Sequence, residues 1–171
     1  MKLQLQKELT GTILDLGGGG EGVIGGLYQS QVTAIDNRQE ELDEAPAGFT
    51  KLCMDAVNLT FCDERFDHVT AFYFFMYLPV EQHIAALREA YRVLKNGGTL
   101  YIWDAVVEKA DPFLADLEID AGGQKITTTY GVYKDNAKQD AAHFVRLCTE
   151  AGFQLLWKQE ADGHLHLRFL K

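Results

Sequence analysis

The sequence predicts an α/β fold: a three-layer αβα sandwich around a mostly parallel, seven-stranded sheet with an antiparallel C-terminal strand. Three observations predict it. Strand and helix patterns alternate along most of the chain, a run of glycines follows the first strand, and a tight turn joins the last two strands. Strands that alternate with helices pair in parallel through crossover connections. A length of 171 residues suits one domain, which we place at 1–171.

The first half of the chain holds four predicted strands, at 12–16, 32–35, 49–54 and 66–73. Each is a short apolar run, and β-branched and aromatic residues are frequent in the fourth. Residues 22–29 predict a helix after the first strand, and a short acidic helix is expected after the second strand, before Pro46.

The second half begins with the clearest helical pattern. Residues 80–95 carry apolar side chains at three- and four-residue spacing, and the Asn96-Gly97-Gly98 that follows is typical of a helix end. A fifth strand is expected at 99–103.

The C-terminal third departs from this alternation. Residues 105–135 are expected to form an insertion, either a β-hairpin or a cap over a substrate, and a helix near 137–151 ends at Gly152. The last two strands, 153–158 and 164–170, are separated only by a tight turn, so they must be antiparallel.

Composition and charge disfavour several classes of protein. The chain carries 16 Lys and Arg against 25 Asp and Glu, a net charge of −9, whereas a nucleic-acid surface needs clustered basic residues. The longest apolar stretch, 69–80, is shorter than the roughly 20 residues of a membrane-spanning helix. Three cysteines without a CxxC pair, and an N-terminus without an apolar run, favour a cytoplasmic protein. We therefore expect neither a nucleic-acid nor a membrane partner.

The glycine run indicates a ligand that approaches the backbone. Gly17, Gly19 and Gly22 satisfy GxGxxG, and Asp36 lies 19 residues after Gly17, where an NAD-binding fold places the acid that binds ribose. An NAD-dependent oxidoreductase is therefore one alternative.

Three acids favour a different ligand. Asp15 lies inside the first strand, where a carboxylate is expensive unless something satisfies it, and Asp36 and Asp55 follow the second and third strands. Ligands of open α/β sheets bind at the carboxyl ends of the strands. Since the loop has no lysine or arginine, the acids favour a cationic nucleoside over an anionic dinucleotide.

Four motifs in order resemble the class I S-adenosylmethionine-dependent methyltransferases of the small, single-domain type. Ile13–Gly19 resembles the first motif of the family, and Thr33–Asn37 resembles the acidic end of its second strand. Asp55–Asp67 resembles the stretch that enters the fourth strand, and Arg92–Gly98 the motif before the fifth. The resemblance implies a Rossmann-like fold, S-adenosyl-L-methionine as cofactor and methyl transfer to a small molecule.

The resemblance also implies roles for matching residues. The residues that would bind the cofactor are Asp15, Gly17, Gly18 and Gly19 (methionine and ribose), Asp36 and Asn37 (ribose and adenine), Asp55 and Ala56 (adenine), and Phe72 and Tyr73 (methionine end). For Asp36 or Asp55 alone, a helix cap or a solvated carboxylate would be the simpler interpretation, but their joint placement favours binding.

The substrate side is less determined. Tyr77, Tyr130 and Tyr133 are candidates to face the substrate. No catalytic residue is assigned, because alignment alone can supply most of the acceleration of methyl transfer. Asp104 is a possible base or a structural acid, and His83 a possible base or an exposed helix residue.

No metal site is expected. His164 and His166 share a strand face, but no third ligand is apparent, and a solvent-facing strand pair is the simpler interpretation. The predicted hairpin could also pair with a second subunit, which would give a homodimer. A non-catalytic module that binds S-adenosylmethionine is the second alternative.

Overall fold

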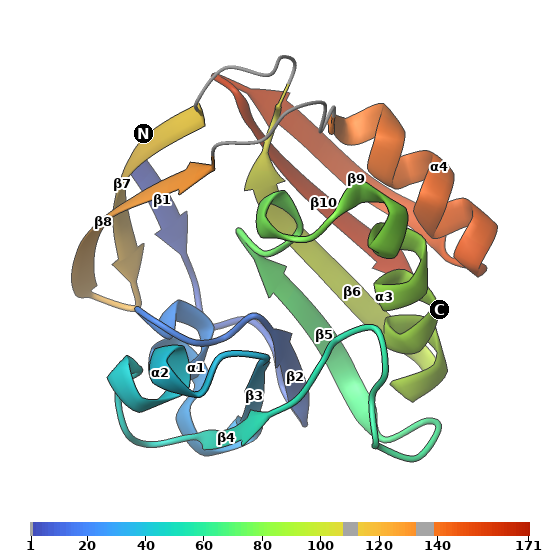
Figure 1. The fold of residues 1–171 in the computed structure, drawn as a ribbon, viewed down its shortest axis with the longest axis horizontal. Helices are drawn as coiled ribbons and strands as arrows, with labels where there is room; N and C mark the ends of the chain where they lie inside the picture. The colour runs from blue at the N-terminus through green and yellow to red at the C-terminus, as the bar shows by residue number, and fades with distance from the viewer. Residues whose placement is uncertain (1, 108–112, 133–138) are drawn as a thin grey trace.

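The computed structural model describes residues 2–107, 113–132 and 139–171, and a seven-stranded sheet runs through its centre (Figure 1). The strand order is β4-β3-β2-β5-β6-β10-β9. These strands are β2 (Ile13–Leu16), β3 (Val32–Asp36), β4 (Thr50–Cys53), β5 (Phe66–Phe72), β6 (Leu94–Ala105), β9 (Gln154–Ala161) and β10 (His164–Leu170).

The pairing confirms the predicted fold class. Along the run β4-β3-β2-β5-β6, each strand is parallel to the next. β10 is antiparallel to both β6 and β9. The tight turn between β9 and β10 contains Asp162 and Gly163, which both have positive φ.

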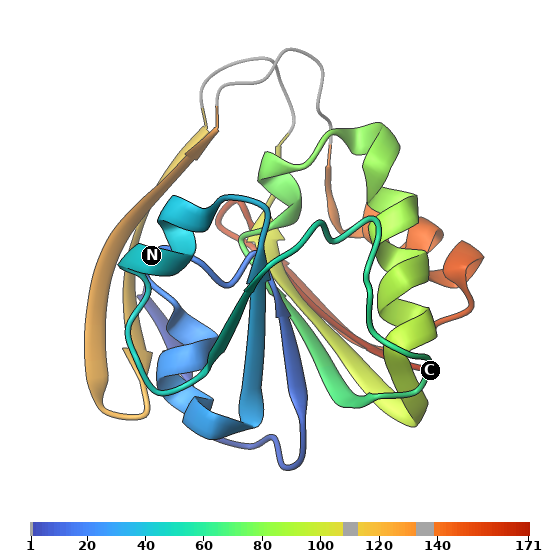
Figure 2. The ribbon, with the colours of Figure 1, turned by 60° about the horizontal axis from the view of Figure 1, so that its bottom comes forward.

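Helices cover the sheet on both faces, as Figure 2 shows. They are α1 (Val23–Tyr28), α2 (Gln39–Glu44), α3 (Val80–Val93) and α4 (Ala141–Ala151), with 3₁₀ turns at Gln29–Gln31 and Phe75–Tyr77. Because side chains alternate along a strand, Leu14 and Leu16 of β2 pack with α3 and α4, whereas Ile13 packs with α1 on the other face. No helix in the described ranges is long and apolar enough to cross a bilayer.

A second, three-stranded sheet adds to the layer that contains α1. It consists of β1 (Lys2–Leu5), β7 (Phe113–Ala121) and β8 (Gln124–Val132) in the order β1-β7-β8. β7 and β8 form an antiparallel hairpin within the segment where the sequence suggests an insertion, and β1 pairs in parallel with β7. The sequence does not predict β1. Leu117 and Ile119 of β7 are buried with α1 and the central sheet.

The predicted helix end at Asn96-Gly97-Gly98 is wrong. α3 ends at Val93, and β6 already begins at Leu94, which has extended ψ and pairs with Phe66. The two glycines therefore lie in a strand, beside a register shift in the pairing of β5 with β6. Gly97 has φ +77°, and Gly98 passes so close to Lys95 O and Asp67 O that a Cβ would lie 2.8 and 3.0 Å from them.

The helix predicted near 137–151 begins at Ala141. Gln139 pairs with Val107 in an isolated bridge, and Asp140 caps the helix by accepting a hydrogen bond from His143 N. Gly152, with φ +108°, ends it as predicted. Residues 137 and 138 lie outside the described residues.

We expect Gly98→Ala to destabilise the protein by about 1–3 kcal/mol, because the new methyl group would contact two backbone oxygens. Gly26→Ala in α1 is the matched control, since a Cβ there meets nothing within 4 Å. It should raise the free energy of unfolding by about 0.5–1 kcal/mol. Urea unfolding measures both, and equal effects would contradict the close approach at Gly98.

Candidate functional site

A pocket of about 570 Å³ lies at the carboxyl ends of β2, β3, β4 and β5. This volume is within the usual range of small-molecule sites, about 300–1,000 Å³. It is lined by Gly17, Gly19, Gly20, Glu21, Ile35, Asp36, Asn37, Arg38, Glu41, Met54, Asp55, Ala56, Phe72, Tyr73, Phe74, Tyr77, Leu78, Thr129 and Tyr130. Ten of the residues that the sequence suggests for a site are therefore brought together. Tyr133 lies outside the described residues.

The glycine loop forms one wall of this pocket. Gly17 has φ +68°, and a Cβ there would lie 2.6 Å from the Phe74 ring. A Cβ at Gly19 would lie 2.5 Å from Glu41 Cβ. Larger residues at either position would push the loop away from its neighbours, so the glycines are required by close packing.

Asp15 lies behind the loop and does not line the pocket, and nor does Gly18. The Asp15 side chain is buried, and Thr70 Oγ1 donates a hydrogen bond of 2.7 Å to Oδ1. Burial raises the pKa of Asp15 to about 7; the Thr70 hydrogen bond opposes this shift, and the Asp36 charge adds to it. Gly18 passes directly above, since a Cβ there would lie 2.5 Å from Asp15 Oδ2.

Two carboxylates lie at the end of the pocket formed by β3 and β4. Asp36 Oδ1 accepts a hydrogen bond of 2.9 Å from Arg38 N, and Asp55 Oδ1 accepts one of 3.0 Å from Val57 N. Each carboxylate thus shapes its own turn with one oxygen. The Arg38 guanidinium forms an ion pair with Glu41 on α2.

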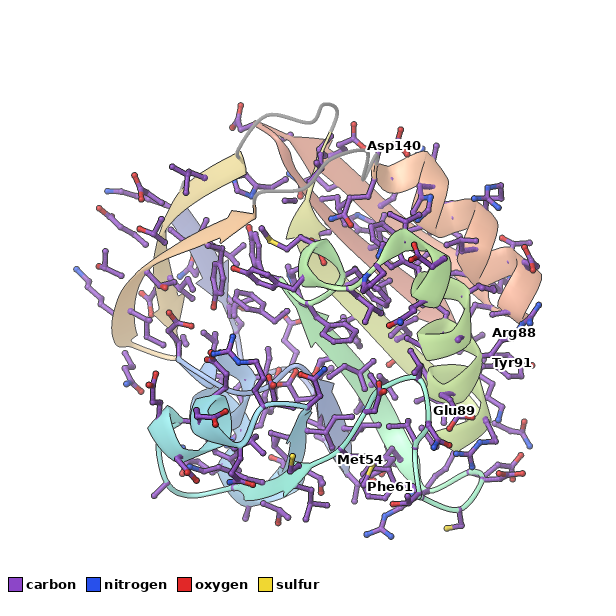
Figure 3. The ribbon with its side chains drawn as sticks, in the orientation of Figure 1. Met54, Phe61, Arg88, Glu89, Tyr91 and Asp140 are labelled. Atoms are coloured by element: carbon purple, nitrogen blue, oxygen red, sulfur yellow. The ribbon has the colours of Figure 1, made fainter. Side chains whose placement is uncertain are left out.

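The segment that carries Asp55 and Ala56 is held by α3. Arg92 donates to Phe61 O at 2.7 Å and to Leu59 O at 2.9 Å, and it pairs with Asp63 and Glu89. Glu89 Oε2 in turn accepts a hydrogen bond of 2.8 Å from Leu59 N. Figure 3 shows Glu89 on the side of α3 that faces Met54 and Phe61. The sequence shows Arg92 only as part of a motif, and no local pattern indicates this long-range role.

Aromatic side chains form the opposite end of the pocket. Tyr73 has φ +50°, which is strained for a bulky residue, and its N–H donates to Trp103 O at 2.7 Å. The Tyr73 ring stacks on Tyr130 of β8 with centroids 4.7 Å apart and an interplanar angle of 5°. Its hydroxyl lies 2.7 Å from Nδ1 of His164, which is half-buried and not fully solvent-facing as the sequence suggests.

The rim beside these rings is polar. Tyr130 Oη donates to Glu21 Oε2 at 3.2 Å, and Thr128 Oγ1 donates to Glu21 Oε1. Gly131 N donates to Tyr77 Oη at 3.2 Å, and Tyr77 is 48% exposed. The hydroxyls of β8 thus meet the glycine loop across the rim. Sequence reasoning missed Glu21, because its partners are more than a hundred residues away.

Asp104 and His83 do not line the pocket. Asp104 is buried and accepts hydrogen bonds from Phe75 N, Ala105 N and Gln139 Nε2, so it acts as a structural acid. Burial raises the pKa of Asp104 to about 7. His83 is also fully buried, with Nε2 3.0 Å from Phe75 O, so the expectation of an exposed residue is wrong. It lies on the same helix face as Leu87 and Ala90, which pack against the sheet.

A family model described as a methyltransferase domain matches residues 14–102. A search of curated proteins finds no match.

Solved structures share the fold. An S-adenosylmethionine-dependent methyltransferase from Mesorhizobium loti has 15% identity and a TM-score of 0.67 over 94% of this chain and 90% of its own. A putative methyltransferase from Haloferax volcanii, in complex with the Trm112 activator, has 17% identity and a TM-score of 0.67, over 94% of this chain and 81% of its own. The glycopeptide N-methyltransferase MtfA, complexed with S-adenosyl-L-homocysteine, has 16% identity and a TM-score of 0.65, over 94% of this chain and 83% of its own.

The buried Asp15 predicts a pH dependence. Its pKa rises from 3.8 to about 7 on folding, so between these values the folded state binds more protons and stability falls as pH rises. Asp15→Asn removes this titration, whereas Asp104 titrates in both proteins. As the pH rises from 5 to 8, we expect the free energy of unfolding of the variant, measured in urea, to increase by about 1–3 kcal/mol relative to that of the native protein. A difference that is constant with pH would show that Asp15 titrates normally.

The contacts of Arg92 predict a second effect. We expect Arg92→Lys to lower the free energy of unfolding by about 1–3 kcal/mol, because a lysine cannot reach both carbonyls and both carboxylates. Hydrogen exchange of the Leu59 amide should accelerate. Arg88→Lys is the control: Arg88 forms an exposed pair with Glu150, and its replacement should cost less than about 1 kcal/mol. Slow exchange at Leu59 in the Arg92 variant would contradict the role of the network.

Proposed function

The chain belongs to the methyltransferase domain family, and on this basis we propose that it transfers a methyl group from S-adenosylmethionine to a small-molecule acceptor. The observation that carries the proposal is the pocket itself, where the glycine loop and the acids after β3 and β4 meet at one sheet edge.

The pocket residues fit S-adenosylmethionine in shape and charge. The loop at Gly17 and Gly19 has no room for side chains, so a ligand can approach its backbone. Among the described lining residues, carboxylates outnumber basic groups, and Arg38 is already paired with Glu41. Such a surface favours a ligand with positive charge. When bound, S-adenosylmethionine supplies an electrophilic methyl group on a positively charged sulfur.

We assign the adenosine to the end formed by β3 and β4. Asp36 accepts hydrogen bonds from the ribose hydroxyls with Asn37 beside the adenine, and Asp55 and the Ala56 backbone bind the adenine edge. The support is that all four residues line the pocket and that each carboxylate uses Oδ1 in its turn.

We assign the methionine moiety to the region between the glycine loop and the aromatic end. Gly17 and Gly19 face it directly, while Gly18 and Asp15 support it from behind the loop. Phe72 and Tyr73 exclude water from the reacting end, since both are buried. No described histidine lines the pocket, so the proposal depends on alignment of the reactants and requires no general base.

A small-molecule acceptor fits the opening. β8 covers the pocket through Thr129 and Tyr130, and the exposed Tyr77 lies at the mouth. A net charge of −9 further disfavours a nucleic-acid acceptor.

Calorimetry with S-adenosylhomocysteine, thermal shifts with NAD, and transfer of labelled methyl to small-molecule and protein acceptors test the proposal together. We expect S-adenosylhomocysteine to bind, NAD not to stabilise the protein, and small molecules to be labelled. Stabilisation by NAD alone would overturn the donor, and cofactor binding without any turnover would indicate a binding module.

Asp36→Asn tests the assigned adenosine end. The amide can still accept the hydrogen bond from Arg38 N, so the turn survives while the charge is lost. We expect the Kd for S-adenosylhomocysteine in calorimetry to rise at least about tenfold, since loss of a charged hydrogen bond costs about 1.5–3 kcal/mol. The exposed Asp43 of α2 provides the control, Asp43→Asn, which should bind normally. Unchanged affinity in the Asp36 variant would remove Asp36 from the site.

A further inference from the structure

Glu21 lies at the end of the pocket away from the proposed adenosine site. Asp36 and Asp55 follow β3 and β4, whereas Glu21 contacts Thr128 and Tyr130 of β8. Tyr130 stacks on Tyr73, which follows β5. In the strand order β4-β3-β2-β5, this group is therefore at the opposite side of the glycine loop from Asp55.

Within residues 2–107, 113–132 and 139–171, no basic side chain pairs with Glu21. Among the residues that the structure describes, its hydrogen-bond donors are two hydroxyls, which carry no charge. Arg38, the arginine among the described lining residues, forms its ion pair with Glu41. The carboxylate thus places a negative charge where an acceptor would enter.

The rings beside Glu21 favour the same sign of ligand charge. Tyr73 and Tyr130 are stacked, and Phe72 contacts both edge-on, with centroid distances of 5.1 and 6.2 Å. Aromatic faces attract cations, more strongly where water is excluded.

We propose that the methyl acceptor is a small organic amine carrying an aromatic or aliphatic body, with its nitrogen beside Glu21 and the Tyr73–Tyr130 pair. The inference rests on the proposed function. The amine binds as an ammonium ion and first releases a proton to water. The lone pair of the resulting neutral amine forms the new N–C bond, and the C–S bond breaks with its electrons remaining on sulfur. The positive charge passes from sulfur to nitrogen, and the methylated ammonium then releases its proton to water.

This movement of charge distinguishes amines from other acceptors. With an amine, the positive charge that develops on nitrogen is stabilised by the Glu21 carboxylate. A carboxylate or thiolate acceptor would bring a negative charge to the same place, where Glu21 repels it. An alcohol gains no comparable attraction before it reacts.

Calorimetry on the S-adenosylhomocysteine-bound protein tests the inference without requiring turnover. The ligands are phenethylamine, 2-phenylethanol and 3-phenylpropionate, with butylamine, butanol and butyrate as an aliphatic set. We expect each amine to bind more tightly than its alcohol and its acid. Labelled methyl transfer from S-adenosylmethionine should follow the same order.

Glu21→Gln keeps an oxygen that can accept from Thr128 or Tyr130 but removes the charge. We expect amine affinity to fall about twofold to fivefold, the effect of a partly exposed ion pair, while affinity for the alcohol and for S-adenosylhomocysteine stays constant. Glu40→Gln, an exposed acid of α2 outside the pocket, should change none of these values.

The outcomes separate the inference from the function on which it rests. A preference for the acids or alcohols, an amine preference that survives Glu21→Gln, or no binding of either amine would overturn the amine acceptor. Equal loss of all ligands in the Glu21 variant would assign Glu21 to holding β8 and would also overturn it. If S-adenosylhomocysteine itself does not bind, the methyltransferase proposal fails instead.

Discussion

The glycine loop after β2 lies close against the sheet edge because Gly18, which has no side chain, passes directly over the Asp15 carboxylate. A Cβ at Gly18 would lie 2.5 Å from Asp15 Oδ2, so a larger residue would lift the loop. Two backbone hydrogen bonds hold the loop in this close position, from Gly18 N to Ile35 O and from Gly20 N to Glu41 O. They attach the loop to β3 and α2. The wall of the pocket and the acids beside it are therefore positioned by one close contact.

Buried acids support the pocket from below at two points. Asp15 lies under the glycine loop, and Asp104 lies under the turn that leads to Tyr77. Neither has a basic partner among the interactions described, and hydrogen bonds from neutral donors satisfy both. A carboxylate in such surroundings is more costly than an apolar residue. The fold retains these groups at its ligand-binding edge, which is where strained and costly features are expected to concentrate.

Local sequence patterns predict those parts of the fold and of the site that depend on residues close together in the chain. The alternation of strands and helices, the glycine loop and the acids that follow β3 and β4 all depend on short segments, and the strand order agrees with them. The start of β6 could not be predicted, because Leu94 leaves the helix to pair with Phe66. β1 has only four residues, of which two are exposed, and it is a strand because it pairs with β7. Glu21 and Arg92 act through partners far along the chain, which no periodicity reveals.

The position of β10 has a consequence for synthesis on the ribosome. β10 lies between β6 and β9, although it is made after both of them. Until it emerges, the edge of β6 has no partner on that side, and the space filled by Leu165, Leu167 and Phe169 is open. β9 cannot join the sheet directly, because it pairs only through β10. The half of the sheet that carries the glycine loop can thus form on the emerging chain, whereas the other half closes only after translation has passed its final strand.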